Sequence, residues 1–567
     1  VDWTRTQAST GSVLDEVFGV APCASVVFDL ALNAQLAARG QLLTAGGAIP
    51  DLRSSPEALE IVARSTPANC TGALSFCPAD ARPVPDALRP TPYLYWAAGK
   101  DKATLASRIA SGKAGGRGKC RIAILAPTED ALRERQKSVQ KQLEQDEIPD
   151  GEGIQFGEGK PEGELAFMFT GSAAVYPRMG RGLLSAFPEL RQRLSKLDKA
   201  EEIAPLLARA SLSEFEQLCA GTLLSQAHAI LLQDILGVKA DAALGLSLGE
   251  SNALFAFGFW RDPGALLDEI SDAAMYERHI GGDFETAKKA WGPNVPADWT
   301  NWRVQAPVEA VKAEVTQHDG VEITIIYSRT DCMIGGPAEA CRQVCAALGP
   351  GSGAKMHQHL IVHAKAMQPF AETWRRLHTR KLHKGKDVRL YANAINAAYE
   401  PTSELAADML TRQAVDTVNF PPTVERAWKD GVRTFVELGP RDTLTSALAN
   451  ILEGKQFKAV ATDRIESADL SQIAELAAFL FADGRAIKMK PVAEALDAAR
   501  RNASRRPEAW PLTRPVPYAP PIVPPLASSF RMPAAPALSD IVYPPSSPAA
   551  TMDEPVHFAP PPSDRRL

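Results

Sequence analysis

The chain has 567 residues, of which 45% are hydrophobic, with a formal net charge of −5 and a pI of about 6.1. This length predicts roughly three or four domains with sizeable cores. The acidic balance provides no basic field for nucleic acid, and no run of 18 uninterrupted apolar residues predicts a membrane span. The eight cysteines form no CxxC pair, which favours a reducing compartment, the cytoplasm. Because the chain begins at Val1 without an initiator Met or signal peptide, we expect it to be a piece of a longer polypeptide.

Proline and glycine mark the boundaries of the expected domains. Pro83–Pro92 interrupts the hydrophobic periodicity, and Glu144–Glu164 is rich in glycine and charge. Pro507–Leu567 holds 17 of the 44 prolines, which is typical of an extended linker or tail. We therefore expect a domain at 1–90, a small module at 91–160, a large domain at 165–490 and a tail at 507–567.

The module at 91–160 is expected to contain two strand–helix units. A strand at Tyr93–Ala98 precedes a helix at Lys102–Ile109, and a strand at Arg121–Ala126 precedes a helix at Asp130–Leu143. This alternation predicts a small α/β fold.

From Leu165 onward, longer helices alternate with short buried strands, which predicts an α/β fold with a hydrolase-like core on a parallel sheet. One block within it has a different pattern. Its sequence predicts a helix, two strands, a helix and a strand, at Val308–Val315, Val321–Tyr327, Cys332–Ile334, Ala338–Leu348 and His357–Val362. Such a block can form a small sheet of its own.

A G-x-S-x-G pentapeptide at Gly245–Gly249 stands between a short apolar strand at Ala242–Leu244 and an apolar helix at Asn252–Trp260. Strand, sharp turn and helix are the setting of a nucleophile elbow, which holds the Ser247 Oγ clear of the backbone. The N–H groups at the start of the helix then point at the reacting oxygen. The pattern predicts Ser247 as a nucleophile.

A serine nucleophile needs a base, and His363 is the best candidate among the nine histidines. It follows an apolar strand at 359–362 and precedes a helix at Ala364–His378, which places it at the C-terminal end of a strand, where α/β active sites form. A histidine base predicts a pH–rate inflection near neutrality. His357 and His359 complete an HxHxxxH pattern, but no carboxylate or cysteine nearby completes a zinc site, so no metal is expected.

Four ordered motifs resemble those of the malonyl/acyl-CoA:acyl-carrier-protein acyltransferases found within polyketide synthases and polyunsaturated fatty acid synthases. Phe169–Gly180 resembles the family's opening FPGQGSQxxxMG, Gly245–Glu250 its GHSLGE, His363–Pro369 the segment around its catalytic His, and Phe435–Pro440 its late FxExGP. The resemblance runs from about Leu165 to Met489. It implies that the block at about 303–362 is the ferredoxin-like subdomain that the family inserts between Ser and His.

The flanks extend this resemblance. Residues 93–160 look like the linker module that joins a ketosynthase to an acyltransferase. Residues 1–90 look like the end of a ketosynthase-type domain without its Lys and His, similar to a chain-length factor. That order resembles the multidomain B-type subunits of polyunsaturated fatty acid synthases.

The resemblance implies a two-step transfer through an acyl-serine. His363 takes the Ser247 proton and Ser247 attacks an acyl thioester, after which a carrier-protein phosphopantetheine thiol, or water, accepts the acyl group. The backbone N–H groups of Ser172 and Leu248 are the expected oxyanion donors, and the backbone carbonyl of Asn419 is expected to orient His363. No bound cofactor is implied, because acyl-CoA or acyl-carrier-protein thioesters are the substrates.

The expected substrate pocket departs from that of malonyl-selecting members. Those carry an Arg about 25 residues after the nucleophile, which pairs with the malonyl carboxylate. The same count reaches Asp272, and Arg278 reaches that place only with a shift of six residues. Leu246 replaces a His, and Tyr327 stands where the family often has a pocket Asn. We therefore expect an uncharged acyl substrate, because Asp272 would repel a carboxylate.

Three functions stay open on the sequence. The first is an acyltransferase or acyl-thioesterase domain of a fatty acid or polyketide megasynthase that handles a non-malonyl acyl group. The second is a malonyl-CoA:carrier-protein transferase, and the third is a non-catalytic scaffold that docks carrier proteins. Retention of Ser247 together with His363 favours an enzyme. The expected partners are an acyl carrier protein and neighbouring megasynthase domains, with neither nucleic acid nor membrane.

Overall fold

The computed structural model describes residues 91–504, except 178, 210, 293–297, 466 and 468, together with four short strands nearer the N-terminus. These strands form two antiparallel hairpins, β1 (Gln41–Thr44) with β2 (Gly47–Pro50) and β3 (Leu59–Ser65) with β4 (Cys70–Phe76). The rest of the expected ketosynthase-like segment and the expected tail lie outside the described residues.

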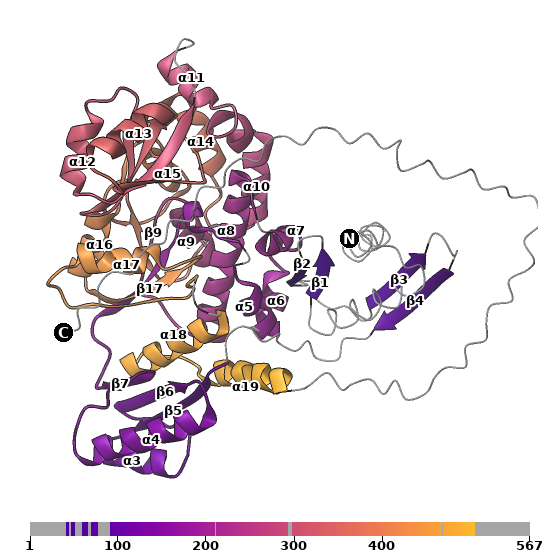
Figure 1. The fold of residues 1–567 in the computed structure, drawn as a ribbon, viewed down its shortest axis with the longest axis vertical. Helices are drawn as coiled ribbons and strands as arrows, with labels where there is room; N and C mark the ends of the chain where they lie inside the picture. The colour runs from indigo at the N-terminus through magenta and orange to yellow at the C-terminus, as the bar shows by residue number, and fades with distance from the viewer. Residues whose placement is uncertain are drawn as a thin grey trace, which may run out of the picture. The chain divides into compact units, whose positions relative to one another are not determined.

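The large domain is built on a six-stranded sheet with the order β15-β14-β9-β8-β17-β18 (Figure 1). Its strands are β8 (Glu164–Phe169), β9 (Ala242–Gly245), β14 (Arg389–Ala392), β15 (Ala397–Tyr399), β17 (Val432–Leu438) and β18 (Lys458–Ala461). All neighbouring strands pair in parallel except β14 and β15. The expected α/β core with a parallel sheet is therefore confirmed.

Alternate residues of a strand point to opposite faces of the sheet, and β8 shows how both faces become buried. Leu165, Phe167 and Phe169 contribute to a large core on one face, whereas Ala166 and Met168 contribute to a smaller core on the other. The large core is covered by α8 (Glu214–Ile230), α9 (Leu248–Ala256), α10 (Pro263–Asp272), α14 (Ala371–His378), α15 (Ser403–Val415) and α18 (Asp469–Asp483), and the smaller core by α16 (Phe420–Lys429) and α17 (Thr443–Ile451).

Shorter helical segments join these elements. They are η1 (Ser172–Ala174), α5 (Arg181–Ala186), α6 (Pro188–Leu194), α7 (Ala200–Ile203), η2 (Ala204–Ala208), η3 (Leu231–Ile235), η4 (Met275–His279), α11 (Glu285–Trp291) and η5 (Lys365–Phe370), and α19 (Lys490–Ser504) follows α18. The segments η3 and η4 are single π-helical turns.

A second sheet forms the inserted subdomain. It consists of β10 (Trp299–Val304), α12 (Val308–Val315), β11 (Glu322–Ser328), β12 (Asp331–Pro337), α13 (Ala338–Ala347) and β13 (Gly353–Lys355), and the short β16 (Val418–Asn419) joins β11. The order is β13-β10-β12-β11-β16. Val311, Ile334 and Val344 belong to a separate small core between this sheet and the two helices.

The strand expected at His357–Val362 is absent, and this expectation was wrong. The segment is irregular and is held by single contacts: the Leu360 N–H donates to Asn301 Oδ1 at 2.8 Å, and the Ile361 N–H donates to the Ile280 carbonyl at 2.8 Å. Leu360 and Ile361 are buried by the surrounding core. Apolar residues that are buried this way resemble a strand in sequence without pairing as one.

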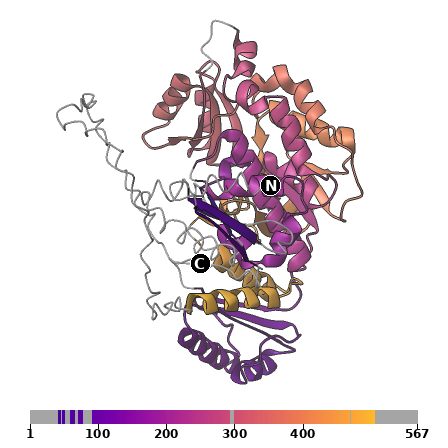
Figure 2. The ribbon, with the colours of Figure 1, turned by 90° about the vertical axis from the view of Figure 1, so that its right-hand side faces the viewer.

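Residues 93–158 form a three-stranded antiparallel sheet with the order β5-β6-β7. It contains β5 (Tyr93–Gly99), α3 (Lys102–Ala110), β6 (Cys120–Ala126), α4 (Glu129–Glu144) and β7 (Ile154–Glu158), the last within the stretch expected to be a break. The side chains of Asp101 and Thr128 cap α3 and α4. Both helices lie on one face of this sheet and α18 lies on the other (Figures 1 and 2).

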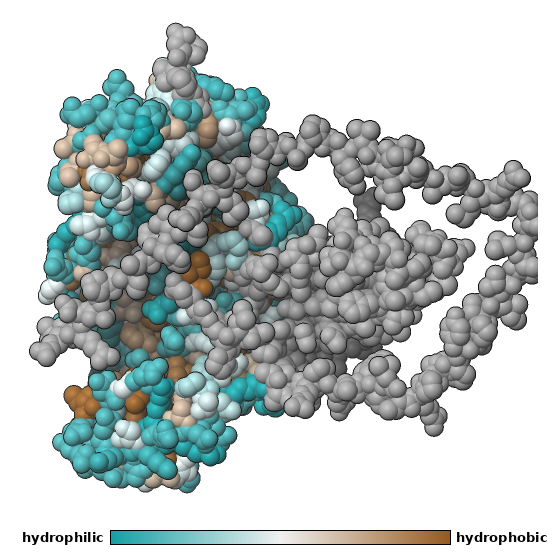
Figure 3. Space-filling model, viewed as in Figure 1, coloured by the Kyte–Doolittle hydropathy of each residue, from teal (hydrophilic) through white to brown (hydrophobic). Residues whose placement is uncertain are grey.

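Among the described residues, only three large apolar side chains are exposed, namely Ile148, Ile395 and Ile465. The face drawn in Figure 3 is accordingly mostly hydrophilic where it is coloured. No helix in this part of the chain has the length and apolar character needed to cross a bilayer.

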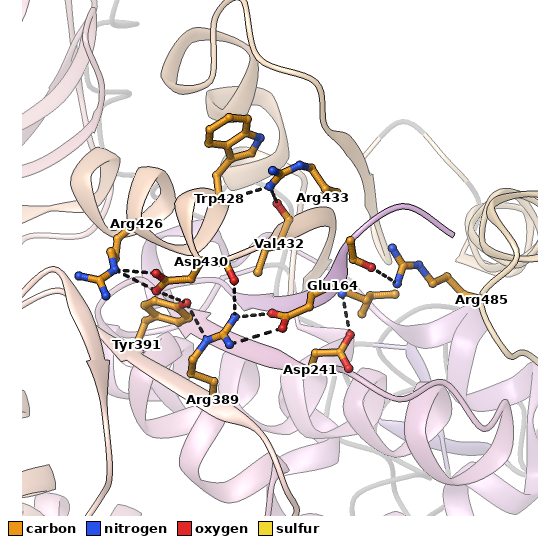
Figure 4. A network of polar contacts seen from close by, with 12 residues as sticks. Glu164, Asp241, Arg389, Tyr391, Arg426, Trp428, Asp430, Val432, Arg433 and Arg485 are labelled. Atoms are coloured by element: carbon orange, nitrogen blue, oxygen red, sulfur yellow. Dashed lines mark hydrogen bonds and ion pairs between the residues drawn. The ribbon is translucent and has the colours of Figure 1, made fainter. Parts of the chain in front are cut away.

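A polar network joins the beginnings of β8 and β14 to the end of α16 (Figure 4). Arg389 pairs with Glu164 and donates to the Tyr391 hydroxyl at 2.8 Å, and that hydroxyl donates to Asp430 at 2.8 Å. Asp241 accepts from the Leu165 N–H at 2.9 Å. These contacts fix the N-terminal edge of the sheet.

We expect Arg389→Met to lower the free energy of unfolding by about 1–2 kcal/mol, because Glu164 and Tyr391 each lose a partner in a half-buried site. Urea denaturation measures this difference. The control is Arg342→Met, which removes an exposed pair with Glu339 one helical turn away and should cost less than about 0.5 kcal/mol. Equal losses in the two variants would show that the network adds nothing beyond a surface ion pair.

Candidate active site

Ser247 forms the sharp turn between β9 and α9, with φ 56° and ψ −120°. A Cβ at Gly245 would lie 2.1 Å from the Gly249 carbonyl carbon, and a Cβ at Gly249 would lie 2.0 Å from the Phe169 oxygen. The turn is therefore tight enough to require both glycines. A serine at positive φ is strained, and such strain is typical of functional positions.

His363 faces this serine. Its Nε2 lies 2.7 Å from the Ser247 Oγ, and its Nδ1 lies 2.5 Å from the Gln413 backbone oxygen. Because a carbonyl only accepts, Nδ1 carries the proton and Nε2 is free to accept the serine proton. His363 is on a loop at φ 63°, not at a strand end, and the helix expected at 364–378 is divided into η5 and α14.

Gln413, and not Asn419, supplies the carbonyl that orients the histidine. Gln413 lies in the last turn of α15, and its side-chain amide also donates to the Ser247 backbone oxygen at 3.3 Å. The neighbouring Ala414 carbonyl accepts from the His363 N–H at 2.7 Å. Asn419 lies in β16, where it pairs with Ile326. No motif marks Gln413 in the sequence, because its role depends on its backbone carbonyl.

The two backbone N–H groups expected to bind an oxyanion are those of Ser172 and Leu248. β8 and β9 are adjacent, and the Leu246 N–H donates to the Phe169 oxygen at 2.9 Å, which brings the loop after β8 beside the elbow. Leu248 begins α9 and Ser172 begins η1, and both line the cavity. Within the part of the chain that the structure describes, neither N–H has an acceptor. The Ser172 hydroxyl instead lies 3.3 Å from the Gln358 side chain.

A buried network holds the loop that carries Ser172. The Tyr176 hydroxyl donates to Asp463 at 2.8 Å, and Asp463 also accepts from the Arg441 N–H at 2.9 Å. The Arg441 side chain donates to the Ala174 oxygen at 3.0 Å. The loops after β8, β17 and β18 are therefore tied together behind the oxyanion position.

Two buried glutamates form hydrogen bonds with the segments that carry the site. Glu250 accepts from the backbone and side-chain N–H groups of Asn393 at 2.8 and 2.7 Å, and the same amide donates to the Gly245 oxygen at 2.7 Å. Glu437 accepts from two N–H groups in the first turn of α17, those of Leu444 and Thr445. Burial raises the pKa of each carboxyl to about 8. These glutamates account structurally for two motif positions, GLSLGE and FVELGP.

Ser247 and His363 open into a cavity of about 720 Å³. Leu246 and Tyr327, both buried, line it as expected residues of the pocket. One wall comes from the helices and is called the helical wall; it consists of Gln217, Leu218, Thr222, Leu248, Ser251, Asn252, Phe255, Pro263, Leu266, Leu267, Ile270, Tyr276, Trp374, His378, Leu410, Gln413 and Ala414. Most of the remaining lining comes from the β8 loop, the inserted subdomain and the loop after β17.

The structure places Asp272 and Arg278 outside the cavity, which corrects the expectation for both. The face of α10 that lines the cavity carries Leu266, Leu267 and Ile270, whereas Asp272 ends the helix in an exposed position. Arg278 is exposed and pairs with Glu285 at 2.6 Å. A count along the sequence could not reveal this, because the helix ends and a π-turn follows.

The HxHxxxH pattern does not assemble into a cluster. The His359 Nδ1 accepts from the Asn301 N–H at 3.3 Å, and His363 is engaged with Ser247. Within the described ranges, no three His, Cys, Asp or Glu side chains are placed to hold a metal ion.

Several known proteins are similar to this chain in sequence. No family model matches the chain. The B subunit of the polyunsaturated fatty acid synthase of Thraustochytrium sp. is 26% identical over 257 residues, which are 42% of this chain and 12% of that protein. The malonyl CoA-acyl carrier protein transacylase of Bacillus subtilis is 24% identical over 324 residues, which are 54% of this chain and 96% of that protein.

Solved structures agree on the fold. The acyltransferase domain from module 8 of the salinomycin polyketide synthase superposes with a TM-score of 0.55 at 14% identity, over 72% of this chain and 99% of that domain. The acyltransferase domain of SpnD gives 0.53 at 16% identity, over 72% and 98%. The chain has the acyltransferase fold. It spans less than a fifth of the length of three multidomain synthases that it matches.

The pH dependence of this acyltransferase-fold site follows from the burial of His363. Burial lowers the pKa of His363 to about 4, although the bond to Gln413 opposes the shift. As the expected base, His363 is active when neutral, so acylation should fall as the pH drops through about 4 and stay level near neutrality. A pH–rate profile of Ser247 acylation measures this. The expected fall near pH 4 replaces the inflection near neutrality that a histidine with its ordinary pKa predicts.

The matched variant is His363→Gln, which should lower the level part of that profile by roughly 10²–10⁴ and remove the fall near pH 4. An unchanged rate and an unchanged profile in His363→Gln would show that another group is the base.

Proposed function

We propose that this chain forms an acyl-serine at Ser247 from an acyl thioester. The observation that carries the proposal is the hydrogen-bonded series Ser247 Oγ–His363–Gln413 carbonyl, which faces two backbone N–H groups that have no acceptor among the described residues. His363 removes the serine proton as Oγ attacks the thioester carbonyl, and the Ser172 and Leu248 N–H groups bind the oxyanion. The thiol then departs with the proton from His363.

We further propose that the acyl group is uncharged. The helical wall carries no Lys, Arg, Asp or Glu side chain. Arg209, Arg303 and Lys355 line other parts of the cavity; the two guanidinium groups pair with Glu216 and Asp331, and Lys355 is exposed. A carboxylate in the helical part of the cavity would lose its hydration without gaining a partner, which strongly disfavours it.

The acceptor in this proposal is the phosphopantetheine thiol of an acyl carrier protein, or water. Transfer to a carrier protein is supported by the relatives, which are parts of multidomain synthases and a transacylase named for this acceptor. Attack by water on the same acyl-serine would make the domain an acyl-thioesterase, with His363 as the base for either acceptor. Neighbouring megasynthase domains are the proposed partners.

Malonyl transfer is the second candidate, because Arg441 is available for it. Arg441 lines the cavity and uses its Nε for Ala174, and no carboxylate of the described residues pairs with its guanidinium. The Bacillus subtilis relative is a malonyl transacylase, and the SpnD domain was solved with a 2-(pent-4-yn-1-yl)malonyl group.

We expect Ser247→Ala to abolish covalent acylation while the protein stays folded, because the turn accepts a smaller side chain. Intact-protein mass spectrometry after incubation with an acyl thioester measures the acyl adduct. The control is Ser271→Ala, an exposed serine on α10, which should acylate like the wild type. An adduct that persists in Ser247→Ala would assign the nucleophile elsewhere.

Neutral thioesters should acylate Ser247 faster than malonyl thioesters, because only the malonyl group brings an unpaired charge to the helical wall. Parallel acylation rates with acetyl, hexanoyl, octanoyl and malonyl thioesters measure the preference, and a longer chain should gain about 0.8 kcal/mol for each CH₂ buried. If malonyl reacts fastest and Arg441→Met removes that advantage, the malonyl candidate is correct and the proposal of a neutral acyl group is wrong.

A further inference from the structure

The helical wall has one feature that an apolar acyl chain does not explain. Asn252 lies in α9, five residues after Ser247, and is 0% exposed. Among the described residues, neither its Nδ2 nor its Oδ1 has a hydrogen-bond partner, and the hydroxyl of Thr222 also lacks one. Both residues belong to the lining of the cavity. A donor, an acceptor and a hydroxyl are thus unpaired on two facing helices of this wall; the Trp374 Nε1 and the Gln413 Oε1 are the other unpaired polar atoms of the wall among the described residues.

The packing of α8 against α9 brings Thr222 beside the first turn of α9, close to Asn252. The Gln226 side chain donates to the Asn252 backbone oxygen at 3.1 Å, and Thr222 stands one helical turn before Gln226. A Cβ at Gly221, the residue before Thr222, would lie 3.7 Å from the Leu248 side chain. Thr222 therefore lies between the levels of Leu248 and Asn252, on the helix that faces them.

Neither side chain adds a hydrogen bond to the fold among the described residues. Asparagine has a low helix propensity, and an apolar residue of similar size would fill this place without leaving an amide unpaired. Most buried polar side chains in proteins are hydrogen-bonded, so an unpaired pair within a cavity needs an explanation. The absence of charge restricts the explanation. The amide offers an acceptor as well as donors, and neither group can offset the charge of a buried carboxylate, so the pair suits an uncharged oxygen function better.

We propose that Asn252, with Thr222, binds an uncharged oxygen function on the acyl chain, a hydroxyl or a ketone, so that the preferred substrate is an oxygenated acyl thioester. The inference rests on the proposed formation of an acyl-serine at Ser247. Five residues of helix rise about 7.5 Å, so the amide stands within reach of the first few carbons of the bound chain. A hydroxyl donates to Oδ1 and accepts from Nδ2, and a ketone accepts from Nδ2 and from the Thr222 hydroxyl.

The experiment compares thioesters of equal length on the same protein. N-acetylcysteamine thioesters of hexanoate, 3-hydroxyhexanoate, 3-oxohexanoate and 5-hydroxyhexanoate are incubated with the full chain, and the rate of adduct formation on Ser247 is followed by mass spectrometry. At least one oxygenated thioester should react about 10- to 100-fold faster than hexanoyl, because a site built to bond an oxygen rejects the analogue that lacks it.

Asn252→Leu should remove this preference, and Thr222→Val should reduce it, in each case through a slower reaction of the oxygenated thioester. The matched control is Gln472→Met in α18, which changes another buried amide with one unpaired oxygen, outside the cavity. The control should keep the wild-type ratio. Because each ratio compares two substrates on one sample, partial misfolding of a variant does not alter it.

The outcomes separate the two proposals. If no thioester acylates Ser247, the proposed function fails. If hexanoyl reacts as fast as every oxygenated thioester, or if the preference persists in both Asn252→Leu and Thr222→Val, the acyl-serine proposal stands and this inference is overturned. A lower Tm in Asn252→Leu than in Gln472→Met, with an unchanged substrate ratio, would also overturn it, because it would assign Asn252 to structure alone.

Discussion

The site depends on one contact, the bond between the Gln413 carbonyl and the His363 Nδ1–H. It fixes the tautomer, so that Nε2 faces Ser247 as an acceptor, and it does so with a backbone atom at the end of a helix. The Gln413 side chain meanwhile holds the Ser247 backbone oxygen. One residue thus positions both members of the proposed catalytic pair, although they stand 116 residues apart in the chain. A carbonyl orients the imidazole without adding a negative charge, so burial lowers the pKa of His363 by more than the bond to Gln413 raises it.

The buried glutamates that hydrogen-bond around the turn at Ser247 likewise add no charge. Glu250 is held by Asn393, which also binds the backbone of Gly245, and both carboxyl-bearing motif residues, Glu250 and Glu437, are buried and hydrogen-bonded to N–H groups of the described chain. With pKa values near 8, they are protonated across much of the neutral range. Neutral groups that bond to backbone atoms can brace a strained turn without placing a charge beside the reacting serine.

Much of the fold and the central pair of the site followed from the sequence, because local chemistry specifies them. Glycine is required on both sides of Ser247, because a Cβ at Gly245 or Gly249 would lie less than 2.2 Å from a backbone atom. The parallel sheet follows from apolar strands that alternate with helices. The positions that failed depend on tertiary contacts. Asn419 was expected to orient His363, but any residue can supply a carbonyl. Asp272 was placed by counting, yet the helix ends there, and the apolar Leu360 and Ile361 are buried without pairing as a strand.

The small module at residues 93–158 shares part of its apolar core with the large domain, which a simple linker would not do. Ala123 and Leu125 of β6 belong to the same apolar core as Phe167 of the central sheet, with α18 between them, and Arg121 donates to the Ala482 oxygen of that helix. The boundary that the sequence shows near residue 160 is therefore not a boundary of folding. A recombinant acyltransferase domain cut at that point would expose the underside of α18 to water, so the smallest stable unit should begin before Tyr93 and extend through α19.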